Sequence, residues 1–237
     1  MIIILSYASF VIEWEIMNQI EVSPTIEDYL GIIYILERDG EPIAGVRIAS
    51  LLGVTPPTVT NTLKRMIRDG LLCSDENHNI HLTADGMLNA RSVVRRHMLS
   101  EWMLVKMLSW SKLHDQAHLL EHGISDEVEL ALVKELGDPE LCPHGNPLPG
   151  FESSVAEWIC LMEVAKNTRL IVRRIHELAE ETPDMLQFLE SQGIVPGAEA
   201  TLNENLAFNQ TIELELAGRK VTIGYPTARY IYVELVK

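Results

Sequence analysis

The stretch VRIASLLGVTPPTVTNTLKRMIRDGLL, residues 46–72, contains two short amphipathic segments that meet at Gly53. The second segment begins at Thr55, a residue type that caps helices, and continues with two prolines at positions where a missing N–H costs nothing. Gly70 ends it, and LLCSDENHNIHLTADG then reads as two short strands around a polar turn. A helix-turn-helix followed by a β-hairpin predicts a winged-helix module, with its wing at residues 75–79.

The exposed face of the second helix is rich in small hydroxyl and amide side chains. A helix needed only for packing would not carry so many threonines, which are poor helix formers, at exposed positions. In a winged helix this element enters the major groove, where short polar side chains meet base edges and phosphates. A three-helix bundle without a nucleic-acid role is the alternative. The candidate DNA-binding residues are Thr55, Pro57, Thr58, Thr60, Asn61 and Lys64.

The formal net charge of −15 at first argues against nucleic acid as a partner, because phosphate binding needs a positive surface. The charge is unevenly distributed, however. Between residues 55 and 70, Lys64, Arg65 and Arg68 stand against Asp69, and most acidic residues lie further along the chain. The sequence therefore predicts a local, modest basic face.

A second segment, LHDQAHLLEH over residues 113–122, is rich in metal-binding side chains. At about 100° per residue, an α-helix would place His114, His118, Glu121 and His122 within an arc of about 100°. Clustered imidazoles and carboxylates are what borderline divalent ions need. A solvated polar face is the alternative, but the opposite side mixes apolar and small residues. We therefore expect a divalent-metal site here.

Two more pairs of potential ligands occur in the chain. HMLSE puts His97 and Glu101 four residues apart on one helical face, either as ligands or as an ordinary helix pair. In the break DPELCPHGNPLPG, residues 138–150, Cys142 and His144 could form a ligand pair. Two residues make a weak site, and the surrounding prolines and glycines are typical of a loop. We interpret this break as a loop.

Composition and the first residues bear on location. The chain has 237 residues and three cysteines without a CxxC pair, so we expect no disulfide scaffold and a cytoplasmic protein. The start, MIIILSYASFVIEWEIMNQIE, looks like a leader but lacks a positive charge before Glu13 and Glu15. Its apolar run is too short to span a bilayer. We expect no membrane association and hypothesise that Met17 is the native start.

Beyond the proline-rich break the pattern becomes a helix, ETPDMLQFLESQG, followed by alternating runs. The runs AEATLNEN, TIELELAG, RKVTIGY and YIYVELV read as short strands separated by turns. Such strands predict a small β-barrel. The chain is therefore expected to be mainly α-helical with small β elements, an α+β protein.

Taken in order, the winged helix, HMLSE, HDQAHLLEH, SDEVE and CPHGNPLPG closely resemble the iron- and manganese-dependent repressors related to the diphtheria toxin repressor. The resemblance is specific from about Thr25 to Gly150 and looser through an SH3-like C-terminal domain. It implies a homodimer that, with metal bound, binds double-stranded DNA at a palindromic operator and represses metal-uptake genes. The expected parts are an extra segment over 1–20, a winged-helix domain over 21–86, a metal-binding and dimerisation domain over 87–150 and an SH3-like barrel over 151–237.

Carried over residue by residue, the resemblance implies two metal sites. The primary site would consist of Asp28, His118, Glu121 and His122. The ancillary site would consist of His97, Glu101 and His114, joined by Glu181 and Asp184 of the C-terminal domain. Asp28 lies in the first helix, ahead of the DNA-binding helices, so a metal there would tie the two functions together.

The predicted metal follows from two departures from the family pattern. Iron-type members have methionine in place of Asp28 and cysteine in place of His118, whereas manganese-type members share the aspartate and usually have glutamate at the second position. Oxygen in place of sulfur favours Mn²⁺, and the second imidazole suits Fe²⁺, Co²⁺ or Zn²⁺. We expect Mn²⁺ or Fe²⁺ as the cofactor, with Zn²⁺ or Co²⁺ able to bind in vitro.

Two other classes of function are weighed against a metal-dependent repressor. A metalloenzyme would use a His/Glu site with an open coordination position, but HExxH, a nucleophile elbow and a phosphate-binding glycine loop are all lacking. A metal-independent winged-helix regulator would use its histidines only structurally. The sequence therefore favours a regulator and not an enzyme.

Overall fold

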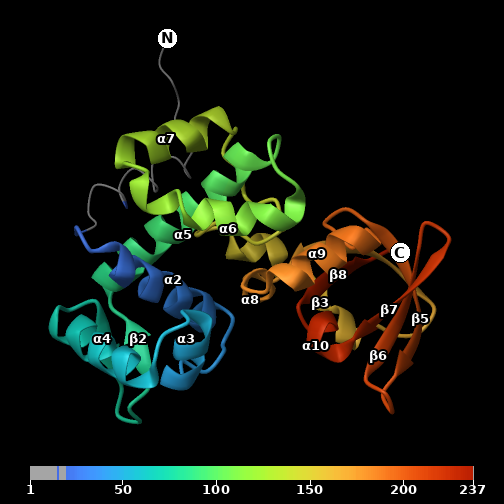
Figure 1. The fold of residues 1–237 in the computed structure, drawn as a ribbon, viewed down its shortest axis with the longest axis horizontal. Coiled ribbons are helices and arrows are strands. Elements are labelled where there is room, and N and C mark those ends of the chain that lie inside the picture. Colours follow the sequence, from blue (N-terminus) through green and yellow to red (C-terminus); the bar gives the residue numbers. More distant parts are fainter. Residues whose placement is uncertain (1–14, 16–19, 237) are drawn as a thin grey trace. The chain divides into compact units, whose positions relative to one another are not determined.

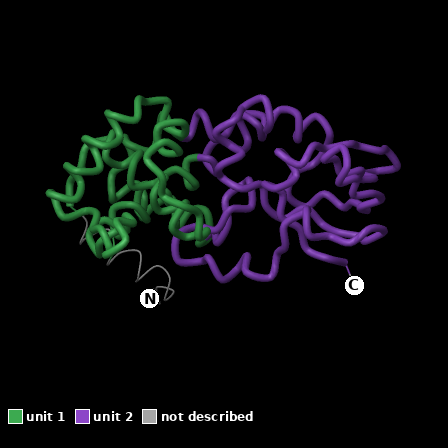
Figure 2. The backbone as a smooth tube through the Cα atoms, turned by 90° about the horizontal axis from the view of Figure 1, so that it is seen from below, with its two compact units in different colours: residues 1–100, 118–138 green, residues 101–117, 139–237 purple. Residues whose placement is uncertain are grey.

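The computed structural model describes residue 15 and residues 20–236. The hypothesised start at Met17 lies outside the described residues. The chain divides into two compact units (Figure 2): unit 1 contains residues 1–100 and 118–138, and unit 2 contains residues 101–117 and 139–237. The segment 87–150 contributes to both units.

Unit 1 begins with the winged helix (Figure 1). Its elements are α2 (Pro24–Arg38), α3 (Gly45–Leu51), α4 (Pro56–Arg68), β1 (Leu72–Ser74) and β2 (Ile80–Leu82). The two strands pair antiparallel to form the wing. This order of elements confirms the predicted DNA-binding fold, and it follows from local signals that each act over a few residues.

Helix α4 shows how those signals work. The Thr55 side chain caps the helix by accepting a hydrogen bond from the amide of Thr58. Val59, Leu63 and Met66 are buried on one side of the helix, which is the three-to-four-residue spacing of an amphipathic helix. The other side therefore remains exposed.

The remainder of unit 1 packs helices beside this module. It contains most of α5 (Ala84–Leu104), the 3-10 helix η2 (Glu121–Gly123) and α7 (Asp126–Glu135). Gly86 is required near the start of α5, because a Cβ there would lie 2.0 Å from the carbonyl oxygen of Leu71. The helix therefore starts in direct backbone contact with the chain that enters the wing.

Unit 2 is built around a six-stranded antiparallel sheet with the strand order β3-β8-β4-β5-β6-β7. The strands are β3 (Ile159–Cys160), β4 (Thr168–Ile175), β5 (Glu199–Leu206), β6 (Thr211–Leu216), β7 (Arg219–Gly224) and β8 (Ile231–Leu235). Its helices are η1 (Trp110–Lys112), most of α6 (Leu113–His118), η3 (Glu152–Val155), η4 (Leu161–Glu163), α8 (Glu177–Glu180), α9 (Pro183–Gln192) and α10 (Tyr225–Ala228).

The C-terminal strands alternate as the sequence predicts. In β6, Ile212, Leu214 and Leu216 are buried, while the residues between them are more exposed. The predicted helix over ETPDMLQFLESQG is α9, which ends at Gly193 in the left-handed conformation. The predicted α+β class is thus confirmed. Among the described residues, no helix is long and apolar enough to cross a membrane.

Candidate metal centre

One cluster of potential ligands lies entirely within unit 1. Asp28 comes from the N-terminal part of α2, just after its first turn, His118 is the last residue of α6, and Glu121 and His122 come from η2. Their ligand atoms all lie within 4.8 Å of one another. We call these four residues the Asp28 cluster; they are the residues of the predicted primary site.

The segment that supplies three of these residues is not one regular helix. Helix α6 ends at His118, Leu119 and Leu120 form a turn, and η2 then begins. The prediction of one continuous helical face over residues 113–122 was therefore wrong. Across this break Glu121 and His122 meet His118, whereas His114, also on α6, belongs to unit 2 and has different neighbours.

The contacts within the Asp28 cluster are short. His122 Nε2 lies 3.0 Å from Asp28 Oδ1 and 3.5 Å from Glu121 Oε1. His118 Nδ1 lies 3.1 Å from the same Glu121 oxygen. Glu121 is buried, whereas His118 is half-exposed. The cluster is therefore closed on the protein side and reachable from solvent through His118.

The histidines around Glu121 control its ionisation. Burial acts to raise the pKa of Glu121, but hydrogen bonds from His118 and His97 outweigh it and lower that pKa to about 2. Burial is also the main cause that raises the pKa of Asp28, opposed by the nearby His122 and His118. Glu121 is therefore a carboxylate at neutral pH, the form that binds a cation.

The donor set of the Asp28 cluster fits a divalent ion. Two imidazoles and two carboxylates are typical ligands of Mn²⁺, Fe²⁺, Co²⁺ or Zn²⁺. The Oδ1 atom of Asp28 is buried and accepts no hydrogen bond from the described residues. Such an atom is costly unless a cation or a donor meets it. The residues therefore fit the metal that the sequence predicts.

A second cluster lies entirely within unit 2. His114 Nδ1 is 2.9 Å from Glu180 Oε2, and His144 Nδ1 is 2.9 Å from Glu101 Oε1. Ligand atoms of Glu101, Cys142, His144 and Glu180 all lie within 4.8 Å of one another, and all four side chains are buried. We call these five residues the Glu101 cluster. It joins the C-terminal end of α5 to α8 and to the CPHG segment.

Ionisation in the Glu101 cluster reflects burial and the carboxylates. Burial alone would lower the pKa of His114, but hydrogen bonds to Glu180 and Glu181 raise it well above its usual value. Burial raises the pKa of the Cys142 thiol, and the nearby carboxylates raise it further. The thiol is therefore protonated without a cation beside it, and metal binding there would release a proton.

The predicted ancillary residues belong to both units, and the set as a whole stays a prediction. His97 belongs to unit 1, where its Nδ1 lies 2.5 Å from Glu121 Oε2, beside the Asp28 cluster. Glu101 and His114 are in the Glu101 cluster, and Glu181 Oε1 lies 3.6 Å from His114 Nε2. Asp184, in the first turn of α9, belongs to no ligand group of the described residues.

Three cluster members were missed by the sequence reasoning. Glu180 stands one position before Glu181, and only the packing of α8 shows which of the two is buried. Cys142 and His144 were interpreted as loop residues, yet both are buried. The CxH spacing was the signal that could have indicated these residues. The prolines around it suggested an exposed loop, whereas the segment is buried.

The DNA-binding candidates all lie on the exposed surface of α4 or at its N-cap: Thr55, Pro57, Thr58, Thr60, Asn61 and Lys64. Three of the threonine hydroxyls are already engaged at the start of the helix. Thr60 Oγ1 donates to the carbonyl oxygen of Pro56, and the Thr55 and Thr58 hydroxyls lie 2.9 Å apart. Asn61 and Lys64 therefore offer the stronger donors of this surface.

A winged helix and a carboxylate–imidazole cluster in one unit define a class, namely DNA-binding proteins with a divalent-metal site. Three family models match the chain. They are described as the iron dependent repressor N-terminal DNA binding domain (residues 21–78), the iron dependent repressor metal binding and dimerisation domain (residues 83–150) and the FeoA domain (residues 159–235).

Named relatives match this chain over up to 90% of its length. The iron-dependent repressor IdeR of Mycobacterium leprae (strain TN) is 34% identical over 225 residues, which cover 90% of this chain and 97% of that protein. The diphtheria toxin repressor of Corynebacterium jeikeium (strain K411) is 43% identical over 130 residues, 54% of each chain. The chain therefore belongs to the iron-dependent, or diphtheria toxin, repressor family.

Solved structures agree. The manganese regulator SloR superposes with a TM-score of 0.75 at 29% identity, covering 91% of this chain and 100% of that one. A manganese-dependent transcriptional repressor in complex with manganese gives a TM-score of 0.78 at 27% identity, covering 89% and 100%. These relatives are named regulators or repressors, so the chain is a regulator and not an enzyme. The expected SH3-like domain corresponds to the FeoA match.

Proposed function

We propose that this chain is a transcriptional repressor that senses Mn²⁺ or Fe²⁺, binds a palindromic operator as a homodimer in the cytoplasm, and controls metal-uptake genes. The domain boundaries at 21–86, 87–150 and 151–237 belong to the same proposal. Family membership supports the class of regulator. The assignment of the site rests on the geometry of unit 1.

One observation carries the proposal: Asp28 belongs to the DNA-binding module, but its cluster partners come from the segment around η2. A ligand set shared by two segments this far apart in sequence binds a cation only when both are in place. Metal binding and the position of α2 are therefore linked, and each favours the other.

The four residues of the Asp28 cluster supply two kinds of ligand. Asp28 and Glu121 provide the carboxylates, and His118 and His122 provide the imidazoles. A bound Mn²⁺ or Fe²⁺ supplies two positive charges that offset the two carboxylates. Two oxygen donors suit Mn²⁺ and two nitrogen donors suit Fe²⁺, and relatives of both kinds, iron-dependent and manganese-dependent, are similar to this chain.

The Glu101 cluster is proposed as the second, ancillary metal site. Its ligands would be Glu101, His114, Cys142, His144 and Glu180. With a thiol among them, this set favours softer ions than the Asp28 cluster does. The DNA contacts are proposed on the exposed face of α4, with Asn61 and Lys64 as the main donors and the wing lying near the phosphate backbone.

The test is anaerobic fluorescence anisotropy on the protein's own upstream promoter DNA at fixed salt. Binding is measured first with a chelator and then with Mn²⁺, Fe²⁺, Co²⁺ or Zn²⁺, because affinities at different salt concentrations cannot be compared. We expect tight binding only with metal. The ion that gives it at the lowest free concentration ranks the cofactors.

Two carboxylate-to-amide variants separate the proposal from a metal-independent regulator. Glu121→Gln removes a ligand, whereas Asp115→Asn changes an exposed carboxylate of α6 that belongs to neither cluster. We expect Glu121→Gln to lose metal-dependent DNA binding and Asp115→Asn to retain it. Equal DNA binding by the wild type with and without metal would overturn the proposal.

A further inference from the structure

Glu27, the residue directly before Asp28, is a buried carboxylate that is not a member of the ligand group. Its Oε2 lies 2.5 Å from His122 Nδ1, and its Oε1 accepts a hydrogen bond from Arg96 Nη2 at 2.9 Å. Both oxygens are thus engaged in charge-assisted contacts. Neither oxygen is turned toward solvent as an ordinary first-turn glutamate would be.

The contact with His122 fixes where that imidazole carries its proton. An ionised carboxylate can only accept, so this 2.5 Å contact is a hydrogen bond when Nδ1 of His122 carries the proton, and Glu27 favours that tautomer. In the neutral ring the lone pair is then on Nε2. This is the nitrogen that lies 3.0 Å from Asp28 Oδ1 and 3.5 Å from Glu121 Oε1. Glu27 therefore presents the ligating nitrogen of His122 to the other members of the cluster.

Arg96 holds Glu27 in this role. It is buried on α5, and besides Glu27 it donates through Nη1 to the carbonyl oxygen of Ile124 at 3.2 Å. Ile124 follows η2 directly, so one guanidinium joins α2 to the segment that carries Glu121 and His122. The positive charge of Arg96 also offsets that of the Glu27 carboxylate, which would otherwise add to the negative charge around the metal position.

His118 gives a useful contrast within the same cluster. Its Nδ1 faces Glu121, itself a member of the ligand group, and its ring is half-exposed. His122 instead contacts Glu27, a carboxylate outside the ligand group, and Glu27 in turn contacts the buried Arg96. The arrangement His122–Glu27–Arg96 is the kind of support that orients a metal-bound imidazole and raises its basicity.

We propose that Glu27 is a positioning residue of the metal centre, which sets the tautomer of His122 and, through Arg96, ties the first turn of α2 to the η2 segment. This inference rests on the proposed metal-binding function of the Asp28 cluster. Glu27 does not bind the metal itself. Its loss should lower affinity for Mn²⁺ about 10- to 100-fold, the range found for supporting partners of metal-bound histidines.

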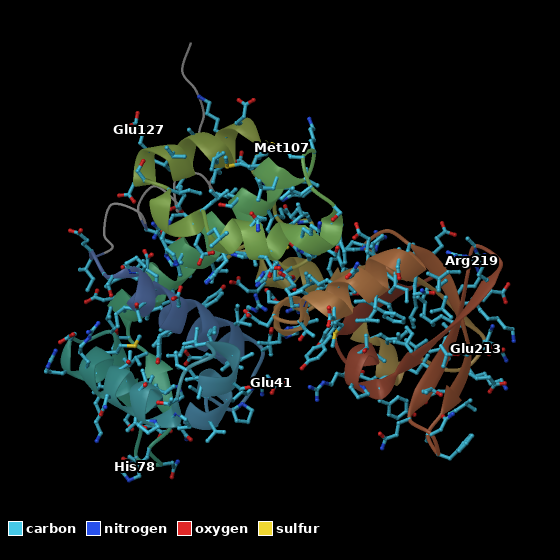
Figure 3. The ribbon with its side chains drawn as sticks, in the orientation of Figure 1. Glu41, His78, Met107, Glu127, Glu213 and Arg219 are labelled. Atoms are coloured by element: carbon cyan, nitrogen blue, oxygen red, sulfur yellow. The ribbon has the colours of Figure 1, made fainter. Side chains whose placement is uncertain are left out.

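The experiment compares Glu27→Met, which removes both contacts, with Glu27→Gln, whose amide oxygen can still accept from His122. Mn²⁺ affinity is measured by competition with a fluorescent chelator. Glu41→Met is the matched control, because Glu41 (labelled in Figure 3) is an exposed glutamate paired with Arg47 and lies outside both clusters. We expect a large loss for Glu27→Met, a partial recovery for Glu27→Gln and no change for Glu41→Met.

A second readout needs neither metal nor DNA. In metal-free wild-type protein, ¹⁵N NMR of the neutral imidazole should show His122 with its proton on Nδ1. In Glu27→Met this preference should disappear while far-ultraviolet circular dichroism stays unchanged.

The outcomes separate the two proposals. An Nε2–H tautomer in the wild type, or Mn²⁺ affinity in Glu27→Met within twofold of the wild type, would overturn the role of Glu27. If the wild type binds no divalent ion, both proposals fail. If Mn²⁺ affinity falls as expected but DNA binding proves independent of metal, only the repressor function is refuted.

Discussion

Replacing Glu129 with alanine is expected to destabilise unit 1 by about 3–5 kcal/mol, the cost of breaking a buried ion pair. Glu129, on α7, is fully buried; its Oε1 accepts from Arg95 Nε at 2.5 Å and its Oε2 from Ser92 Oγ at 2.9 Å. Arg95 is equally buried. Without Glu129, the buried Arg95 guanidinium loses one carboxylate partner and keeps Glu15, and the buried Ser92 hydroxyl loses its acceptor.

The charge balance of this region supports the upper part of that range. Three arginines of α5, Arg91, Arg95 and Arg96, meet three carboxylates, those of Glu15, Glu27 and Glu129. Removing one carboxylate leaves one positive charge in excess among largely buried groups. Replacing both Arg95 and Glu129 with apolar residues of similar volume should therefore recover most of the lost stability.

The assay is urea denaturation followed by far-ultraviolet circular dichroism. Tryptophan fluorescence is unsuitable, because every tryptophan among the described residues lies in unit 2. The control is Glu41→Ala, which breaks the exposed pair with Arg47 and should cost less than about 1 kcal/mol. The reasoning is refuted if Glu129→Ala costs no more than this control, or if the double variant with Arg95 is less stable than either single variant.

Three further outcomes are expected. The hydrogen bond to Glu37 raises the pKa of His81. The stabilisation of the wing by this pair is therefore complete below an ordinary histidine pKa of about 6.5 and is lost as pH rises through the raised pKa. After correction for intrinsic exchange, hydrogen exchange in the wing should quicken with pH more in the wild type than in His81→Gln. Gly145→Ala should destabilise unit 2 by at least about 2 kcal/mol, measured by tryptophan fluorescence, because a Cβ there would lie 2.0 Å from the carbonyl oxygen of Arg173. Glu15→Ala should cost unit 1 about 3 kcal/mol in the urea assay, and an unchanged midpoint would show that this carboxylate does not balance the arginines of α5.

The winged helix could be predicted from sequence because each of its signals is local. Thr55 and the prolines after it start α4, Gly70 follows its end, and the turn between the strands is organised by Asp75, whose Oδ1 accepts from the amides of Asn77 and Asn79. His78, labelled in Figure 3, lies in this turn with a positive φ of 64°. Such interactions span a few residues, and the sequence alone displays them.

The metal clusters could not be built from local signals. Helical spacing put His114, His118, Glu121 and His122 on one face, but His118, Glu121 and His122 meet across the turn at Leu119 and Leu120, whereas His114 joins the other cluster; tertiary packing decides this. The pairing of Asp28 with His118 came from family resemblance, since no spacing rule connects residues so far apart.

The role of Glu27 could not be predicted from the sequence either. A glutamate in the first turn of a helix is ordinarily explained by the helix dipole, and the pattern around Asp28 favours nothing more. Only the approach of His122 and Arg96 from two other elements gives Glu27 a different role. Residues that support a metal site without touching the metal are therefore the hardest to find from sequence.

Helix α2 runs from the proposed metal centre to the wing within unit 1. Its N-terminal part carries Glu27 and Asp28, and its last turn carries Glu37. The two oxygens of Glu37 contact His81 Nδ1 at 3.0 Å and the Leu82 amide at 3.2 Å in β2. Ten residues of α-helix separate these ends by about 15 Å. A continuous helix of this length moves as a rod, so a change that anchors its first turn also constrains the strand of the wing. The carboxylates at the two ends of α2 thus give the proposed metal-dependent repression a direct structural route to DNA.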